Sequence, residues 1–173
     1  MGLLRLEAAD AYHNTRGTAP DGRRGGLRPR ERCDAMRAFE TFEHTADIGL
    51  LARGRTLVEL FANAADGLAD LTVDRDGLAD AIRVQVSVSA EDREALMVAW
   101  LNELLYLLDT QRFVARRTQI TALAATSLRA KLFGDTIDPD RHTVRRMIKA
   151  ATYHRLSLRR ADGVWEARVI LDL

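Results

Sequence analysis

The sequence has little cysteine, little lysine and no long apolar run. Because Cys33 is the only cysteine, it cannot form an internal disulfide, and a reducing, cytoplasmic compartment is the expected location. The longest apolar stretch, residues 95–108, is interrupted by Asn102 and Glu103 and is too short to span a bilayer. The N-terminus lacks the apolar core of a signal peptide. We therefore expect a cytoplasmic protein that has no membrane partner.

The charge balance excludes a strongly basic or acidic protein. The 173 residues carry 26 basic and 25 acidic side chains, for a net charge of +1. Residues 1–38 hold eight of the basic residues, two of the three prolines and five of the eleven glycines. This composition predicts a disordered leader ahead of a single domain of residues 39–173. The leader's arginines could contact RNA phosphates, but a leader without function, with Met36 as the true start, is the simpler interpretation.

The apolar pattern of the remaining chain predicts two long helices among several strands. Thr56 and Glu59 form a capping-box pattern, and apolar residues follow at helical spacing. A wide apolar surface over residues 90–111 predicts a second, buried helix. The other expected elements are strands at 38–41, 48–52 and 82–88, two strands within 113–133, a loop at 134–139, a short helix at 141–150, and a hairpin of 152–159 and 164–171. We therefore expect an α+β domain with a layered, mostly antiparallel sheet.

Two aspartates stand out by their position in the sequence. Asp47 lies where an early strand is expected to meet a turn, and Asp172 lies on the last expected strand, next to Leu173. Together with Leu173 they could supply the hard oxygen ligands that calcium takes. The simpler alternatives are a turn residue that bonds its own backbone for Asp47 and a solvated acid for Asp172. Alternation along the last strand places Asp172 on the face opposite Trp165.

No motif for a transition metal or a nucleophile accompanies these acids. His44, His142 and His154 lack the close spacing of a zinc site, and a structural hydrogen bond is the simpler role for each. Lys149 lies where the short helix is expected to end. It either pairs with a carboxylate or phosphate, or is an exposed lysine favoured by the helix dipole. No phosphate-binding loop, nucleophile elbow or dinucleotide fingerprint is present.

Five segments together resemble the archease family. They come in the family's order and are spread over residues 39–173; the segments are His44–Leu50, Thr56–Ala65, Trp100–Leu107, Ile148–His154 and Val169–Leu173. The resemblance implies a small α+β protein that is not itself an enzyme and that assists an RtcB-type RNA ligase. That ligase activates RNA ends with GTP and joins them, in tRNA splicing or RNA repair. The accessory protein promotes guanylylation of the ligase and its repeated turnover.

The resemblance also implies roles for individual residues. It implies a calcium site of Asp47, Asp172 and Leu173 and a functional lysine at Lys149. We add His44 and His142 as further candidate contacts with a partner. Asp135 replaces a glutamate that the family often has after its glycine. Nucleic acid would be reached only indirectly, through the ligase.

Two alternatives from other functional classes remain open at this point. One is a metal-dependent hydrolase that uses Asp47, Asp172 and a histidine such as His142, which would need an open coordination position and a base within reach. The other is a chaperone or interaction module that binds no metal.

Overall fold

The computed structural model describes residues 37–44 and 47–173. The predicted leader lies almost wholly outside these residues, and the described residues belong to one compact unit. Its elements, in chain order, are β1 (Phe39–His44), β2 (Asp47–Gly54), α1 (Leu57–Thr72), the short 3-10 helix η1 (Arg75–Gly77), β3 (Ile82–Ser89), α2 (Arg93–Gln111), β4 (Phe113–Leu123), β5 (Ser127–Thr136), β6 (Ala150–Ala161) and β7 (Val164–Asp172). Within the described region, neither long helix has the length and apolar character needed to cross a membrane.

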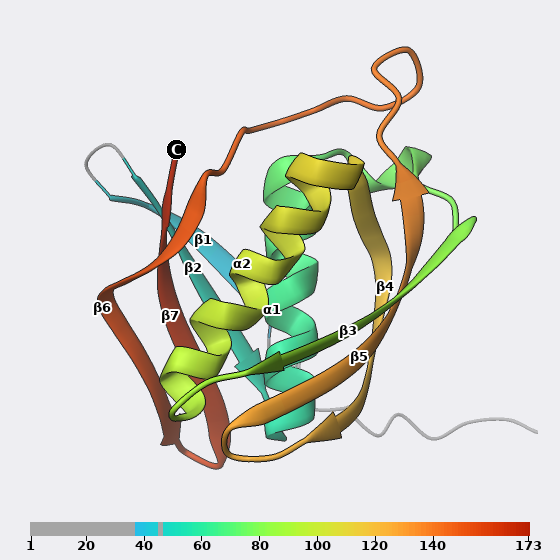
Figure 1. The fold of residues 1–173 in the computed structure, drawn as a ribbon. Coiled ribbons are helices and arrows are strands. Elements are labelled where there is room, and N and C mark those ends of the chain that lie inside the picture. The colour runs from blue at the N-terminus through green and yellow to red at the C-terminus, as the bar shows by residue number, and fades with distance from the viewer. Residues whose placement is uncertain (1–36, 45–46) are drawn as a thin grey trace, which may run out of the picture. The chain divides into compact units, whose positions relative to one another are not determined.

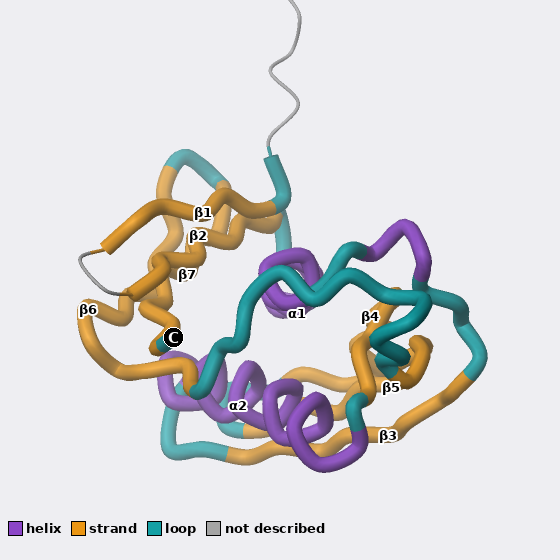
Figure 2. Tube along the Cα trace, turned by 90° about the horizontal axis from the view of Figure 1, so that it is seen from above, coloured by secondary structure: helices purple, strands orange, loops and turns teal. Residues whose placement is uncertain are grey.

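The strands form two antiparallel sheets, with both long helices between them. The first sheet has the order β1-β2-β7-β6 and the second has the order β3-β5-β4. Helix α1 packs on β2 of the first sheet and β4 of the second, and α2 packs on β6 and β3. Figures 1 and 2 show the two helices enclosed by the sheets in this way. The predicted α+β class with two long helices is confirmed, with the strands divided between two sheets.

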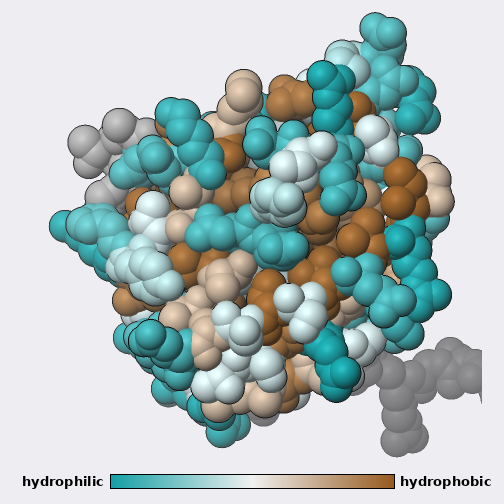
Figure 3. Space-filling view, in the orientation of Figure 1, coloured by the Kyte–Doolittle hydropathy of each residue, from teal (hydrophilic) through white to brown (hydrophobic). Residues whose placement is uncertain are grey.

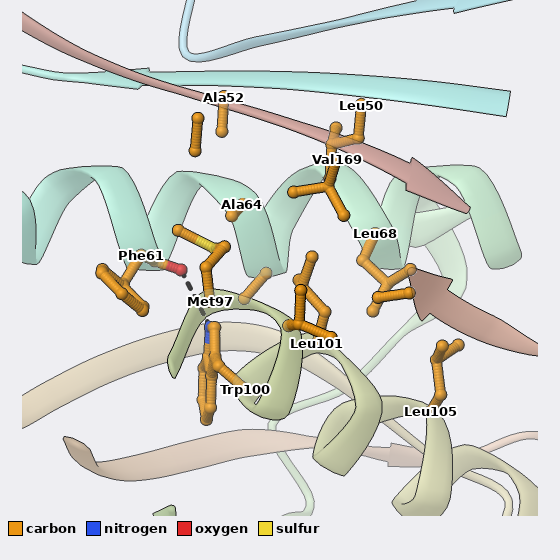
Figure 4. Packing of buried hydrophobic residues seen from close by; sticks show 14 of the residues in the cluster. Leu50, Ala52, Phe61, Ala64, Leu68, Met97, Trp100, Leu101, Leu105 and Val169 are labelled. Carbon is orange, nitrogen blue, oxygen red and sulfur yellow. Dashed lines mark hydrogen bonds between the residues drawn. The ribbon is translucent and has the colours of Figure 1, made fainter. Parts of the chain in front are cut away.

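The core forms where the two helices meet both sheets. Figure 4 shows Leu50 and Val169 from the sheet pointing towards side chains of α1 and α2. Trp100 on α2 and Phe61 on α1 are both fully buried. The indole Nε1 of Trp100 donates a hydrogen bond of 3.0 Å to the main-chain oxygen of Phe61. This bond satisfies the one polar group of the Trp100 side chain. The two helices are therefore joined by a polar contact inside an apolar layer.

Helix α2 is buried along much of its length, as its wide apolar surface predicts. On the face of the molecule that carries α2 and β3, apolar residues lie between charged ones, and hydrophilic residues gather towards the margins (Figure 3). The helix begins at Arg93 rather than at residue 90 because the Asp92 side chain accepts a hydrogen bond from the Ala95 amide at 2.8 Å. Its C-terminal cap, Arg112, adopts a left-handed conformation with φ of 53°.

The predicted capping box at the start of α1 is confirmed, with a shift of one residue. The Thr56 hydroxyl oxygen accepts a hydrogen bond from the Glu59 amide at 3.1 Å. The Glu59 carboxylate accepts one at 2.7 Å from the Arg55 amide, one residue before the cap. Both bonds satisfy amides near the helix start, which fixes where the chain leaves β2 and enters α1.

The short helix predicted at residues 141–150 is wrong. The segment between β5 and β6 is extended and crosses above the helices as a loop (Figure 1). Val144 forms an isolated bridge with Val73, and the Arg145 amide donates to the Thr72 oxygen at 2.9 Å. The Asp74 amide donates in turn to the main chain of this segment. Main-chain bonds to the residues after α1 replace the bonds that a local helix would make.

The loop predicted from residue 134 also begins later than expected. Strand β5 continues to Thr136, because Gly134 pairs with Ile82 on β3 and Thr136 pairs with Phe113 on β4. A Cβ atom at Gly134 would lie 1.9 Å from the Val114 main-chain oxygen. The glycine therefore permits a close approach of two strands and does not mark a turn.

Candidate functional site

Asp47 and Asp172 lie side by side at one end of the first sheet. Strands β2 and β7 pair with Ile48 opposite Leu171, and continuing this register by one residue sets Asp47 opposite Asp172. Residues that face each other across antiparallel strands point to the same side, with Cα atoms about 4.5–5.5 Å apart. Asp47 is half-buried and Asp172 is exposed. Two carboxylates therefore share one face of the sheet at its edge.

The two aspartates belong to a row of residues that crosses all four strands. On β1, His44 pairs with Asp47, and on β6, Ala150 pairs with Asp172. The backbone register thus brings His44 to the row, although its side chain lies outside the described part of the structure. The sheet, rather than any local motif, assembles the row from the two ends of the domain.

Lys149 is tied twice to the last residues of the chain. Its amide donates a hydrogen bond of 2.8 Å to the Asp172 oxygen, and its Nζ donates one of 2.6 Å to the main-chain oxygen of Leu173. Figure 1 shows the chain end beside the beginning of β6. Lys149 lies in extended chain just before β6, so a helix dipole has no part in its placement. Its ammonium group lies at the same end of the sheet as the two carboxylates.

The donor atoms at this end of the sheet suit a hard cation. Asp47 and Asp172 offer carboxylate oxygens and Leu173 offers a main-chain oxygen, which are hard ligands. Calcium takes about six to eight oxygens, so water or another molecule would supply the rest. Among the described residues, no three or more histidine, cysteine, aspartate and glutamate side chains are grouped to hold a metal. The residues fit an open calcium site, not a closed cage.

His142 lies apart from these groups and has a structural environment. Only 4% of the residue is exposed. Its Nδ1 accepts a hydrogen bond of 3.0 Å from the Asp138 amide, so Nε2 carries the proton and donates to the Gly77 oxygen at 3.2 Å. A buried ring with both nitrogens occupied offers no surface to a partner and no free base. The expected partner contact at His142 therefore does not fit the structure, and His142 is not available as the base of the hydrolase alternative.

Asp135, near the end of β5, lies close to His142. It is 7% exposed, and its carboxylate accepts a hydrogen bond of 2.8 Å from the Thr136 amide. Its second oxygen lies 3.6 Å from Arg141 and 3.9 Å from Nε2 of His142. The carboxylate is therefore directed into the protein. Its role is to hold the loop between β5 and β6.

The sequence analysis missed two residues that support the site. Asn102 on α2 bonds both main-chain groups of Ala151, two residues after Lys149. On the outer face of the first sheet, Gly49 leaves room for the Phe42 ring, whose atoms would lie about 2 Å from an added Cβ. The Arg168 guanidinium lies over this ring, 4.5 Å from its centroid. A polar residue inside an apolar helix and a glycine inside a strand were the available signals.

Comparison with known proteins agrees with this description of the domain. The model of the archease protein family matches residues 39–173. A protein archease of Methanosarcina mazei is 34% identical over 139 residues, which cover 78% of this chain and 95% of that protein. A protein archease of Pyrococcus furiosus is 35% identical over 142 residues, which cover 80% of this chain and all of that protein.

Two solved structures are similar to this one. A Methanobacterium thermoautotrophicum protein, solved in solution, has a TM-score of 0.69 at 35% identity and covers 80% of this chain and 100% of its own. An archease of Thermotoga maritima has a TM-score of 0.53 at 22% identity over 78% of this chain and 96% of its own, and supports the fold alone. The family match over residues 39–173 and the relatives at 34–35% identity settle the classification: the chain belongs to the archease family.

Proposed function

We propose that this chain is a calcium-binding accessory protein of an RtcB-type RNA ligase. It promotes guanylylation and multiple turnover of the ligase in tRNA splicing or RNA repair, acts in the cytoplasm and is not itself an enzyme. Membership of the archease family supports the proposal. The observation that carries it is the row that sets Asp47 opposite Asp172, with Leu173 and Lys149 at the same end of the sheet.

Calcium at this position would stabilise the end of the first sheet. Asp47 begins β2 and Asp172 ends β7, so an ion bound by both would hold two strand ends together. Like charges directly opposite each other on antiparallel strands are destabilising, and a divalent cation relieves that repulsion. Lys149 offsets part of it through its contact with Leu173. The expected result of binding is a more ordered surface at this edge.

The same edge is accessible to a partner protein. Asp172, Leu173 and Lys149 are all exposed. They present acidic oxygens and an ammonium group within one short stretch of surface, which suits a partner that has complementary charges. Coordination positions that this chain leaves unfilled could accept oxygens of the ligase. Calcium would then order the contact surface, and the ammonium group of Lys149 would contact an acidic group of the ligase.

The test compares Asp47→Asn and Asp172→Asn with Asp162→Asn. Asp162 is an exposed residue in the turn at the opposite end of the β6–β7 hairpin, and asparagine tolerates its left-handed backbone. Each change removes one carboxylate charge and keeps the side-chain shape. Calorimetry with calcium should show affinity reduced by about tenfold or more in the first two variants and unchanged in the third.

Stimulation of ligase guanylylation, with the ligase in excess over this protein, is the functional readout. We expect Asp47→Asn and Asp172→Asn to lose stimulation and Asp162→Asn to retain it. Normal stimulation by both site variants would refute the metal-site mechanism. If the wild-type protein bound no calcium yet still stimulated the ligase, an interaction module without metal would replace this proposal.

A further inference from the structure

The outer face of the second sheet carries a set of cations that the proposed function does not use. Residues that pair across a sheet share a face, so the register assigns three rows to the solvent side. These rows are Arg83–Phe133–Arg117, Gln85–Lys131–Gln119 and Ser87–Arg129–Ala122. The alternate residues, such as Leu128 and Leu132 of β5, point into the core. We call Arg83, Arg117, Arg129, Lys131 and Phe133 the basic sheet face.

The cations of this face are largely unneutralised. The three rows contain four cations and no acid. Arg117 pairs with Asp80, at 3.1 Å, from outside the rows. In the part of the chain that the structure describes, Arg83, Arg129 and Lys131 form no ion pair. A surface of this kind attracts an anionic partner.

The first sheet shows the opposite arrangement. On its outer face, Arg53 bonds both Glu40, at 3.0 Å, and Glu166, at 3.1 Å. Arg159 bonds the second oxygen of Glu166 at 3.0 Å. There Arg53 and Arg159 are matched by acids on neighbouring strands, and Arg168 lies over the Phe42 ring. The excess of positive charge on the second sheet is therefore not a general property of this chain's strands.

Phe133 gives the basic sheet face a flat, apolar element at its centre. It lies on the middle strand and is half-buried. The Arg117 guanidinium lies 3.8 Å from the ring centroid, and Arg83 lies 5.8 Å from it on the opposite strand. Aromatic rings and guanidinium planes are the surfaces on which unpaired nucleobases stack.

A shallow groove lies on the same sheet, over the two rows next to that of Phe133. It has a volume of about 400 Å³ and is lined by residues that include Gln85, Thr121, Arg129 and Lys131. Arg129 and Lys131 are two residues apart on one strand, so their Cα atoms are about 6.6 Å apart. Amide and hydroxyl groups beside two cations can bond sugar hydroxyls while the cations hold phosphates.

We propose that the basic sheet face binds single-stranded RNA directly. Arg129 and Lys131 would contact backbone phosphates, and the stack of Phe133 and Arg117 would receive a base. A basic protein segment would not fit, because the charge has the wrong sign, and an acidic peptide would leave the flat centre without a matching group. This inference is separate from the calcium site and the ligase, and adds a direct contact with RNA to the indirect one that the family resemblance implies.

The test measures binding of fluorescent twelve-nucleotide oligouridylate to the pure full-length chain, with EDTA and without ligase. The first variant is Arg129→Gln/Lys131→Gln, and its matched control is Arg146→Gln/Arg160→Gln, which removes two exposed cations outside the second sheet. Both keep residues 1–36, so any binding by the seven arginines there is common to both. Phe133→Leu tests stacking. Urea denaturation of each variant confirms that it is folded.

We expect the Arg129→Gln/Lys131→Gln variant to bind about tenfold more weakly at 50 mM salt, with the salt slope reduced by about 1.4, or about 0.7 per lost phosphate contact. Phe133→Leu should weaken binding by about fivefold or more. The control pair should bind nearly as well as wild type. The proposal is overturned if wild type does not bind, if the control loses as much affinity as the first variant, or if oligothymidylate binds as tightly as RNA. Because ligase and calcium are absent, these outcomes leave the proposed function untouched.

Discussion

Asn102 holds Ala151 through both polar atoms of its side-chain amide. Its Nδ2 donates to the Ala151 oxygen at 3.0 Å, and its Oδ1 accepts from the Ala151 amide at 2.8 Å. Strand β6 lies at the edge of its sheet, so these main-chain groups point away from β7. A side chain of α2 therefore takes the place of a further strand, covers the edge and fixes the chain two residues after Lys149.

Asn102→Ala should destabilise the domain by about 2–3 kcal/mol. The change removes two hydrogen bonds and leaves two partly buried main-chain groups without partners. Asn63→Ala is a matched control, since Asn63 makes a single bond of 2.7 Å to the Arg53 oxygen, and should cost about 1 kcal/mol. Urea denaturation measures both. Equal losses would show that the paired geometry of Asn102 has no special value.

Gly49→Ala should destabilise the domain by about 1–3 kcal/mol, because an added methyl group would overlap the Phe42 ring. The ring would have to leave its place beside Arg168. In a Phe42→Ala background the same change should be neutral or slightly stabilising, since alanine is less costly than glycine in a strand. A double-mutant cycle by denaturation checks this. Additive effects would exclude the steric explanation.

Glu166 should give the domain part of its resistance to acid. The hydrogen bond from Arg53 lowers the pKa of Glu166 below its ordinary 4.5 and outweighs the opposing effect of desolvation, and a bond from Arg159 acts in the same direction. A lowered pKa in the folded state means that the stabilisation is complete above pH 4.5 and is lost as the pH falls through the folded-state value.

Glu166→Gln should therefore be less stable than wild type at pH 7, and the difference should shrink as the pH falls below about 4. Urea midpoints measured from pH 7 to pH 3 provide the readout. Glu91→Gln, at an exposed glutamate with no ion pair among the described residues, should follow the wild-type curve. A constant difference between wild type and Glu166→Gln at all pH values would show that the loss comes from packing rather than charge.

Local sequence patterns correctly predicted the helices and strands that are specified by residues close together in the sequence. Thr56 with Glu59 located the start of α1, and the alternation over residues 82–88 located β3, because caps and periodic faces are set by nearby residues. The helix expected at 141–150 failed because the chain around Val144 pairs with residues far away in sequence. Propensity carries no information about such partners.

The candidate site shows the same division. Oxygen-bearing residues at Asp47 and Asp172 could be identified from their chemistry, and the family resemblance selected them. Their adjacency depends on the register between β2 and β7, which no local pattern specifies. His142 was a plausible contact by residue type, but its burial follows from hydrogen bonds to Gly77 and Asp138 that only the folded loop creates.

Lys149→Gln separates the two roles that the structure allows for this lysine. The change removes a positive charge and the 2.6 Å bond from Nζ to the Leu173 oxygen, which leaves that oxygen available to a cation. Calcium affinity should therefore rise by about two- to fivefold at low salt, and less at 0.15 M salt. If the ligase contacts Lys149 itself, stimulation of guanylylation should fall at the same time.

Lys149→Arg is the matched control, because it keeps the charge and can still reach a main-chain oxygen. It should bind calcium like wild type and retain most of the stimulation. For Lys149→Gln, calorimetry should show higher calcium affinity, and the guanylylation assay should show lower stimulation. Loss of folding cannot produce this combination, since an unfolded chain would lose both calcium binding and stimulation. A Lys149→Gln variant that stayed folded in urea denaturation but lost calcium binding along with stimulation would instead assign Lys149 to holding the chain end in place for Asp172.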